Sequence, residues 1–253
     1  MTRAINMIDP MPSFIDLHCH CLPGLDDGPA DLDAALTLCR ALVADGIGTV
    51  VATPHQLGPL EGRLAAPAIR AATHSLNAEL TRHGIPLRLL PGAEVRLHEQ
   101  LLQLIADDQV MTLADGRRWL LLEMPQEPFI DIGDLLKTLA AQGLGIVFSH
   151  PERYPWIHRH LPEVLAWRAE WGIKFQVTAA SLLGDFGKPV AELTWHLASL
   201  HAIDMVASDA HSDQGLRSPR LTAAAELVRQ RLGPEIVQQW FIDASAAVLA
   251  DIP

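Results

Sequence analysis

The stretch SFIDLHCH, residues 13–20, decides which fold and which chemistry this chain is expected to have. An apolar run leads directly into two histidines, His18 and His20, two positions apart. Side chains alternate between the faces of a strand, so both imidazoles would project to the same side, where one cation can bind both. The cysteines at 19 and 21 would point the other way, into packing. The stretch therefore predicts a buried strand that ends in a metal site.

Later apolar runs end in the same way, with a histidine or a carboxylate just past each expected strand. The endings are ATPH (52–55), GAE (92–94), LE (122–123), SH (149–150) and SDAH (208–211). A single histidine in such a place is more often a satisfied polar residue than a ligand, but agreement among so many strand ends favours ligands that converge on one rim. With one acid from the loop LDDG (25–28), the candidate metal ligands are His18, His20, Asp27, His55, Glu94, Glu123, His150, Asp209 and His211.

One choice within this set stays open, and one pair of histidines is left out of it. Asp26 is an alternative to Asp27, because spacing alone cannot separate adjacent acids. A second pair with the same spacing, His158 and His160, has no strand before it, so we expect both residues at the surface. No cysteine belongs to the set on alternation grounds, which argues against a structural zinc site built on cysteine.

Apolar strands alternate with helices along the whole chain. We expect seven strands, at 13–20, 49–52, 87–90, 119–122, 145–148, 174–177 and 204–207, and helices at about 32–43, 68–83, 97–106, 132–139, 161–171, 190–201, 220–232 and 234–249. Near-continuous apolar strands suit a parallel sheet buried on both faces, and in a closed barrel the carboxyl ends of all strands share one face. The sequence therefore predicts an α/β fold, a seven-stranded (β/α)7 barrel that forms one domain over 13–253, preceded by a tail at 1–12.

Composition narrows the class of partner. The chain has 253 residues, 49% of them hydrophobic and 19% charged, and its formal net charge is −11. These values indicate a globular protein and argue against a nucleic-acid partner. Three cysteines fit a reducing compartment, and the sequence shows neither a signal peptide nor an apolar run of membrane-spanning length. We therefore expect a cytoplasmic protein without membrane insertion, and an oligomer is compatible with the sequence.

The mixture of imidazole and carboxylate donors points to phosphate chemistry. So many nitrogen and oxygen ligands suggest two or three divalent metals with a bridging carboxylate, and the mixture suits Mn²⁺, Fe²⁺ or Zn²⁺ without choosing among them. Such a site attracts a phosphate dianion and generates hydroxide from water for in-line attack. Arg153 and Arg217, three and six residues past His150 and His211, are placed to bind the phosphoryl oxygens. The sequence contains neither a Cys-x5-Arg phosphate loop nor a P-loop.

Seven short motifs complete the pattern: DLHCH (16–20), PGLDDG (23–28), ATPH (52–55), GAE (92–94), SHPERY (149–154), SLLG (181–184) and SDAH (208–211). Together they resemble the polymerase-and-histidinol-phosphatase (PHP) superfamily, and more narrowly its bacterial capsule-type tyrosine-protein phosphatase branch, the CpsB/CapC/YwqE group. The resemblance runs from about residue 13 to residue 219. The motifs SHPERY and DDG are quite specific to that branch.

The resemblance implies a distorted seven-stranded barrel with up to three metal ions, most often manganese. Carried over by position, one metal would take His18, His20, Glu94 and Asp209, a second Glu94, Glu123 and His150, and a third Asp27, His55 and His211. Arg153 matches the arginine that binds phosphate in this family, and Arg217 matches a second one in a more variable segment. The implied substrate is phosphotyrosine in the tail of a bacterial tyrosine autokinase that controls exopolysaccharide and capsule export.

Three functions stay open on these grounds. The first is a metal-dependent protein-tyrosine phosphatase. The second is a PHP phosphatase of a small phosphomonoester, such as histidinol phosphate or a sugar phosphate, which would share the site and differ in pocket depth. The third is an inactive regulatory module on the same barrel, which the complete set of ligands argues against.

Overall fold

The strands of the computed structural model, which describes residues 13–58 and 64–251, run in parallel. The expected tail at 1–12 lies outside the described residues. Within the described part the strands are β1 (Phe14–Cys19), β2 (Ile47–Ala52), β3 (His55–Gln56), β4 (Arg88–Pro91), β5 (Glu94–Arg96), β6 (Trp119–Glu123), β7 (Gly145–Ser149), β8 (Lys174–Thr178) and β9 (Met205–Ala207). The predicted α/β class with parallel strands is confirmed, and each of the expected strands is present.

The strands are hydrogen-bonded into two sheets, one in the order β1-β2-β4 and the other in the order β3-β5-β6-β7-β8-β9. The short strands β3 and β5, which the sequence did not predict, follow β2 and β4 after breaks of two residues. One break contains Pro54, which has no amide hydrogen to donate to a neighbouring strand. At the far edges, β1 and the segment after β9 meet: the amide of Asp209 donates to His18 O, and the amide of His20 donates to Ala210 O, both at 2.8 Å.

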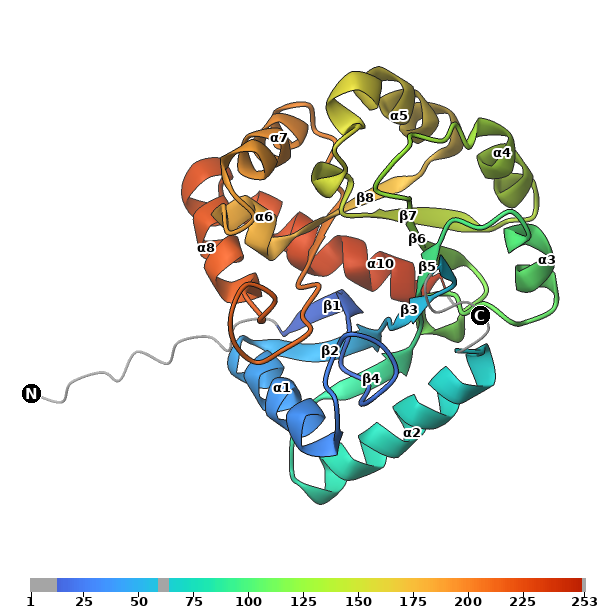
Figure 1. The fold of residues 1–253 in the computed structure, drawn as a ribbon. Helices are drawn as coiled ribbons and strands as arrows, with labels where there is room; N and C mark the ends of the chain where they lie inside the picture. Colours follow the sequence, from blue (N-terminus) through green and yellow to red (C-terminus); the bar gives the residue numbers. More distant parts are fainter. Residues whose placement is uncertain (1–12, 59–63, 252–253) are drawn as a thin grey trace, which may run out of the picture.

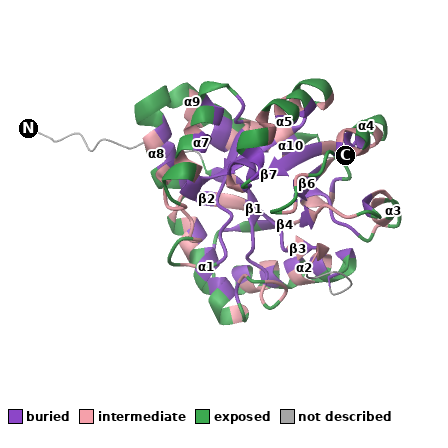
Figure 2. Cartoon of the chain, turned by 45° about the horizontal axis from the view of Figure 1, so that its top comes forward, coloured by how far each residue is buried: buried purple, intermediate pink, exposed green. Residues whose placement is uncertain are grey.

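Most helices lie around the outside of the strands, whereas α10 (Ala244–Ala250) crosses the middle of the view (Figure 1). The other helices are α1 (Leu32–Ala44), α2 (Ala66–Arg82), α3 (Leu101–Ala106), α4 (Gly133–Ala141), α5 (Ile157–Trp171), α6 (Ala179–Leu183), α7 (Lys188–Ser199), α8 (Leu221–Leu232) and α9 (Pro234–Gln238). Their strand-facing sides are buried and their outer sides exposed, as the colours of Figure 2 show. No helix in the described part of the chain has the length and apolarity needed to cross a membrane.

Several helices differ from the sequence prediction: α5 begins at Ile157 instead of 161, α6 was not predicted, and two further differences have a visible cause. The helix expected at 97–106 begins only at Leu101, because the amide of Leu97 donates to Glu123 O at 2.8 Å and keeps the chain extended beside β6. The single helix expected at 234–249 is divided by a π-helical turn, Gln239–Asp243. This turn buries the adjacent aromatic side chains Trp240 and Phe241 together, which a regular helical repeat does not readily allow for neighbouring positions.

A small apolar cluster fills the space between the strands and α10. It takes side chains from β1, β2, β6, β7 and β9 together with one from α10: Leu17, Val51, Leu121, Val147, Met205 and Val248, joined by Leu113. A register shift in β1, where Asp16 pairs with Val50 and Cys19 pairs with Ala52, lies beside this cluster. Such a bulge re-aims the following side chains. The cysteines at 19 and 21 lie in the larger outer core, as alternation predicted.

Candidate metal centre

The nine side chains predicted as ligands meet at the carboxyl ends of the strands. His18 and His20 come from the end of β1, His55 from β3, and the remaining residues from β5, β6, the loops after β7 and β9, and the loop before α1. They form four overlapping groups, each with ligand atoms within 4.8 Å of one another: His20, Asp27, His55 and His211; His18, His20 and Asp209; His18, Glu94 and His150; and His55, Glu94 and Glu123. All nine candidates belong to at least one group.

The innermost group surrounds the Nε2 atoms of His18 and His20, which lie 3.1 Å apart. Asp209 Oδ1 is 3.3 Å from the Nε2 of His18 and 3.5 Å from that of His20. Glu94 Oε2 lies 3.4 and 3.6 Å from the same two atoms. In a tetrahedral site with bonds of about 2.1 Å, neighbouring ligand atoms are about 3.4 Å apart, so His18, His20 and Asp209 have the spacing of one metal's ligands, and Glu94 has this spacing from the two imidazoles.

The carboxylate of Glu94 joins this group to the next. Its Oε1 lies 2.9 Å from His150 Nε2, and its Oε2 lies 3.0 Å from His55 Nδ1. Glu123 adds a carboxylate oxygen 3.9 Å from the same His55 nitrogen. Among the described residues, neither oxygen of Glu94 has a hydrogen bond of proper geometry, although both are buried. A buried carboxylate crowded by imidazole nitrogens, yet without a hydrogen bond, fits a position between two cations.

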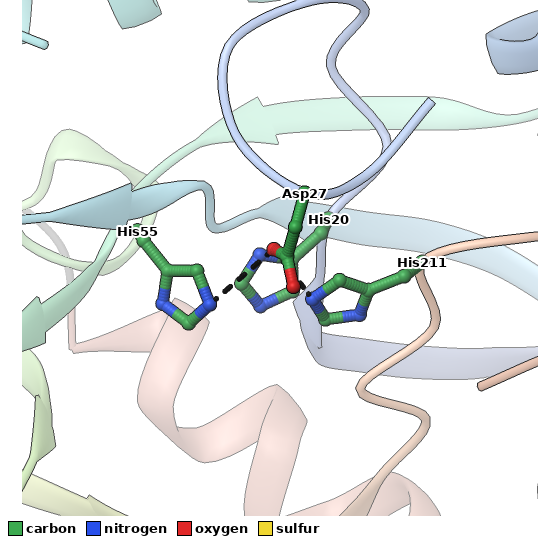
Figure 3. A group of neighbouring side chains, drawn as sticks. All are labelled: His20, Asp27, His55 and His211. Carbon is green, nitrogen blue, oxygen red and sulfur yellow. Dashed lines mark ion pairs between the residues drawn. The ribbon is translucent and has the colours of Figure 1, made fainter. Parts of the chain in front are cut away.

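The outer group is built around Asp27, whose carboxylate lies between the imidazoles of His55 and His211 (Figure 3). Asp27 Oδ1 is 3.2 Å from His211 Nε2 and 3.5 Å from His55 Nε2. His20 lies beside them and stacks on the ring of His211, with centroids 3.7 Å apart. The Asp27 side chain is 55% exposed, so this group faces the solvent while the inner groups are buried.

Three acceptors orient the imidazoles so that their other nitrogens face the centre. His18 Nδ1 lies 2.8 Å from the oxygen of Gln176, whose amide nitrogen in turn donates to Val177 O. His20 Nδ1 lies 2.6 Å from Asp26 Oδ2. His211 Nδ1 lies 2.9 Å from the backbone oxygen of residue 209. A proton on each Nδ1 leaves the Nε2 lone pair free for a metal.

Two of these acceptors bear on the sequence prediction: Asp26 was the alternative to Asp27 as a ligand, and Gln176 was given no role. Asp26, the alternative ligand, points at His20 and at the backbone amide of His55 instead of at the centre, so Asp27 is the acid that lies in the candidate groups. Gln176 was not predicted at all. The available indication was a polar residue in the middle of the apolar strand KFQVT (174–178), where burial requires a partner.

The backbone at two of the candidate ligands is held in the left-handed region. His150 has φ 33° and Asp209 has φ 51°, conformations that non-glycine residues rarely adopt. Next to Asp209, the buried carboxylate of Asp16 fixes the chain by accepting from the amide and the hydroxyl of Ser208 at 3.0 and 2.5 Å. Burial raises the pKa of Asp16 to about 6 although these hydrogen bonds oppose the shift.

Electrostatics within the cluster favour positive charge on two imidazoles. Burial opposes protonation of His18, but the carboxylates of Glu94 and Asp209 outweigh it and raise its pKa to about 9. Burial likewise opposes protonation of His55, where the carboxylate of Glu94 raises the pKa to about 9. The carboxylates thus require compensating positive charge, and divalent cations provide it when they replace the two protons.

Both predicted arginines lie at the mouth of the centre. Arg153, which ends the short 3-10 helix η3 (Pro151–Arg153), donates from Nη1 to Asp209 Oδ2. Arg217 donates to Asp27 Oδ2 at 2.7 Å, and its backbone oxygen accepts from the amide of His211 at 2.8 Å. His158 and His160 lie on α5, away from the candidate groups: His158 is exposed, and His160 stacks on the ring of Phe129.

Comparison with known proteins identifies the family of this chain. The model of a family described as capsular polysaccharide synthesis, CpsB/CapC, matches residues 14–250. The tyrosine-protein phosphatase YwqE of Bacillus subtilis is 37% identical over 199 residues, which are 78% of this chain and 77% of that protein. A putative tyrosine-protein phosphatase, CapC of Staphylococcus aureus, is 30% identical over 201 residues, with the same coverage.

A crystal structure also matches over nearly the whole chain. It comes from work on YwqE of Bacillus subtilis and CpsB of Streptococcus pneumoniae, described there as unique metal-dependent tyrosine phosphatases. The TM-score is 0.87 at 32% sequence identity, and the match covers 94% of this chain and 95% of that one.

Proposed function

Because this chain belongs to the CpsB/CapC family, we propose that it is a metal-dependent protein-tyrosine phosphatase. The observation that carries the proposal is the overlap of four ligand groups, two of which share Glu94, with two arginines at their mouth. Its relatives include metal-dependent tyrosine phosphatases, and their activity indicates the class of reaction.

We propose that the nine candidates hold up to three divalent ions. The distances of Glu94 and of Asp209 from both imidazoles support one ion held by His18, His20, Glu94 and Asp209. A second would take Glu94, Glu123 and His150, with Glu94 bridging, and a third Asp27, His55 and His211. The nitrogen and carboxylate donors suit manganese, iron or zinc alike, and the resemblance to the PHP superfamily favours manganese. When bound, such ions polarise phosphoryl oxygens and lower the pKa of water.

The side chains of this chain then perform three tasks. Gln176 and Asp26 fix the tautomers of His18 and His20, so that these rings need no reorientation when a ligand arrives. Arg153 and Arg217 present planar, forked donors that match the oxygens of a phosphate. The burial of the inner groups excludes bulk water, which strengthens each of these interactions.

Several finer features belong to the same proposal. The pairing of β1 with the segment after β9 supports a distorted seven-stranded PHP barrel over residues 13–253, in which β3 and β5 continue β2 and β4. The family description, capsular polysaccharide synthesis, supports a place in exopolysaccharide regulation, and the resemblance to the CpsB/CapC/YwqE group implies a bacterial tyrosine kinase tail as the substrate. Three free cysteines support a cytoplasmic location.

The test is hydrolysis of a phosphotyrosine peptide by purified protein loaded with Mn²⁺, Fe²⁺ or Zn²⁺, beside a phosphoserine peptide and a sugar phosphate. Phosphotyrosine should be the best substrate, and chelation should abolish turnover. Glu94→Gln removes the bridging charge and should lower kcat/KM by roughly a hundredfold or more. Glu99→Gln, an exposed acid just past β5, is the matched control and should leave turnover unchanged.

Two results would overturn the proposal. If none of the three metals supports hydrolysis of phosphotyrosine, the protein does not have the proposed activity. Turnover that persists after complete chelation, or in the Glu94→Gln variant, would show that the chemistry does not depend on the metal centre.

A further inference from the structure

An open pocket of about 580 Å³ adjoins the outer ligand group. Its walls include three polar residues of the centre, Asp27, His211 and Arg217, together with the apolar side chains of Phe186, Leu216 and Pro29. A ligand in this pocket would therefore meet charged groups that suit a phosphate and apolar groups that suit a hydrocarbon or a ring.

Phe186 is the aromatic side chain of this pocket, and it contacts the phosphate-binding machinery directly. It lies in the loop between α6 and α7, and the guanidinium carbon of Arg153 lies over its ring, 4.8 Å from the centroid. The same guanidinium donates to Asp209. One arginine thus connects the ring of Phe186 to the innermost ligand group.

The loop that carries Phe186 is held in place. The amide of Asp185 donates to Ala180 O, and that of Gly187 donates to Gly184 O, both at 3.0 Å. The carboxylate of Asp185 pairs with Arg220 at 3.1 Å, which ties the loop to the start of α8. A side chain positioned in this way can contact a ligand with little loss of conformational entropy.

We propose that Phe186 binds the phenyl ring of phosphotyrosine and so selects aryl over aliphatic phosphomonoesters. This inference rests on the proposed phosphatase function. In an aryl phosphate the ring is bonded directly to the ester oxygen, so it must lie beside the groups that hold the phosphate. Aromatic rings at centroid distances of about 4.5–7 Å attract one another in offset or edge-to-face arrangements. Leu216, 58% exposed, provides a second apolar surface in the same pocket.

The test compares one enzyme on two substrates, a phosphotyrosine peptide and β-glycerol phosphate, after loading with Mn²⁺. Phe186→Ala should lower kcat/KM for the peptide about 10- to 30-fold, mainly through KM, and should change kcat/KM for glycerol phosphate less than about threefold. Phe186→Leu keeps apolar bulk without a ring and should show the same selective loss, and Phe186→Tyr should restore the peptide rate. Leu200→Ala, an exposed leucine after α7, is the matched control.

The outcomes separate this inference from the function on which it rests. Equal losses for both substrates would mean that Phe186 only supports Arg153, and unchanged rates in both the Ala and the Leu variant would mean that it does not touch the ring. Either result overturns the inference and leaves the phosphatase function standing. Wild-type enzyme that hydrolyses glycerol phosphate but not the phosphotyrosine peptide would overturn the proposed substrate, and the inference with it.

Discussion

Replacing Asp26 by asparagine tests how the centre holds the imidazole of His20. Asp26 Oδ2 lies 2.6 Å from His20 Nδ1 and accepts from the amide of His55 at 3.0 Å, while Oδ1 accepts from the amide of Gly28 at 3.0 Å. One carboxylate thus satisfies three donors. Asparagine has a single oxygen, so its amide nitrogen must face one of these donors, and the negative charge is lost.

The expected cost follows from the burial of the pair. The side chains of Asp26 and His20 are both 0% exposed, so solvent cannot replace the lost acceptor. Removing a carboxylate that orients a metal-binding histidine costs about 10- to 100-fold in metal affinity. Because this pair is fully buried, we expect Asp26→Asn to fall in the upper half of that range, about 2 to 2.7 kcal/mol.

The assay is calorimetric titration with Mn²⁺, combined with metal analysis at saturation. Asp26→Asn should bind the wild-type number of ions with reduced affinity, because all nine candidate ligands remain. Asp27→Asn should bind one ion fewer, because it removes a ligand of the outer group. Asp33→Asn, an exposed acid in the first turn of α1, is the control.

The opposite pattern of metal binding in the two variants would refute the reasoning. If Asp26→Asn lost an ion and Asp27→Asn kept them all, the adjacent acid would be the ligand and the orientation of His20 would have another origin. Unchanged affinity in Asp26→Asn would show that the hydrogen bond to His20 does not hold the imidazole.

Three further predictions use other parts of the centre. Arg153→Ala should lower kcat/KM about 10- to 1,000-fold at unchanged metal content, and Arg153→Lys should recover little; normal kinetics with a lowered Tm would contradict this. Iodoacetamide should leave native turnover intact because Cys19, Cys21 and Cys39 are buried; rapid inactivation of folded enzyme would contradict it. Because the pKa of His18 is about 9, a metal must displace a proton from this imidazole. The affinity for Mn²⁺ should therefore rise about tenfold per pH unit for each displaced proton between pH 6.5 and 8. An affinity that does not change with pH would contradict this prediction.

The same pKa fixes the sign of a stability effect in the metal-free protein. Burial disfavours the protonated form of His18, but Glu94 and Asp209 outweigh it, so its pKa in the folded state exceeds the ordinary value of 6.5. The extra stability is therefore fully present below pH 6.5 and is lost as the pH rises through 9. With metal bound, the same rise in pH should instead favour the folded state, because the displaced proton no longer competes.

The convergence of the candidate ligands could be predicted because it follows from strand geometry and sequence together. Polar residues such as Glu123 and His150 stand directly after apolar runs, and parallel strands bring such positions to one rim. The positions of β2 and β4 were predicted for the same reason. Their continuations β3 and β5 were not, because a two- or three-residue strand after a break has too few residues to show a periodicity.

The orientation of the ligands could not be predicted, because it depends on contacts between distant parts of the chain. Gln176 lies 158 positions from His18, and only the assembled fold brings its amide oxygen to the imidazole. Asp26 and Asp27 are neighbours in sequence but point to different atoms, and the turn between them sets which one reaches the outer group. Local sequence patterns therefore predict which types of residue lie at the site, and contacts in the folded protein determine what each residue does there.

The two arginines allow a protein with a net negative charge to bind the phosphate of its proposed substrate. A chain with a net charge of −11 should repel a phosphate dianion, and in the structure Arg153 pairs with Asp209 while Arg217 pairs with Asp27. Each guanidinium therefore neutralises a carboxylate that is also a candidate metal ligand. When cations take over that neutralisation, both guanidiniums become available to phosphoryl oxygens. Phosphate affinity should therefore depend on metal loading even though the arginines themselves bind no metal.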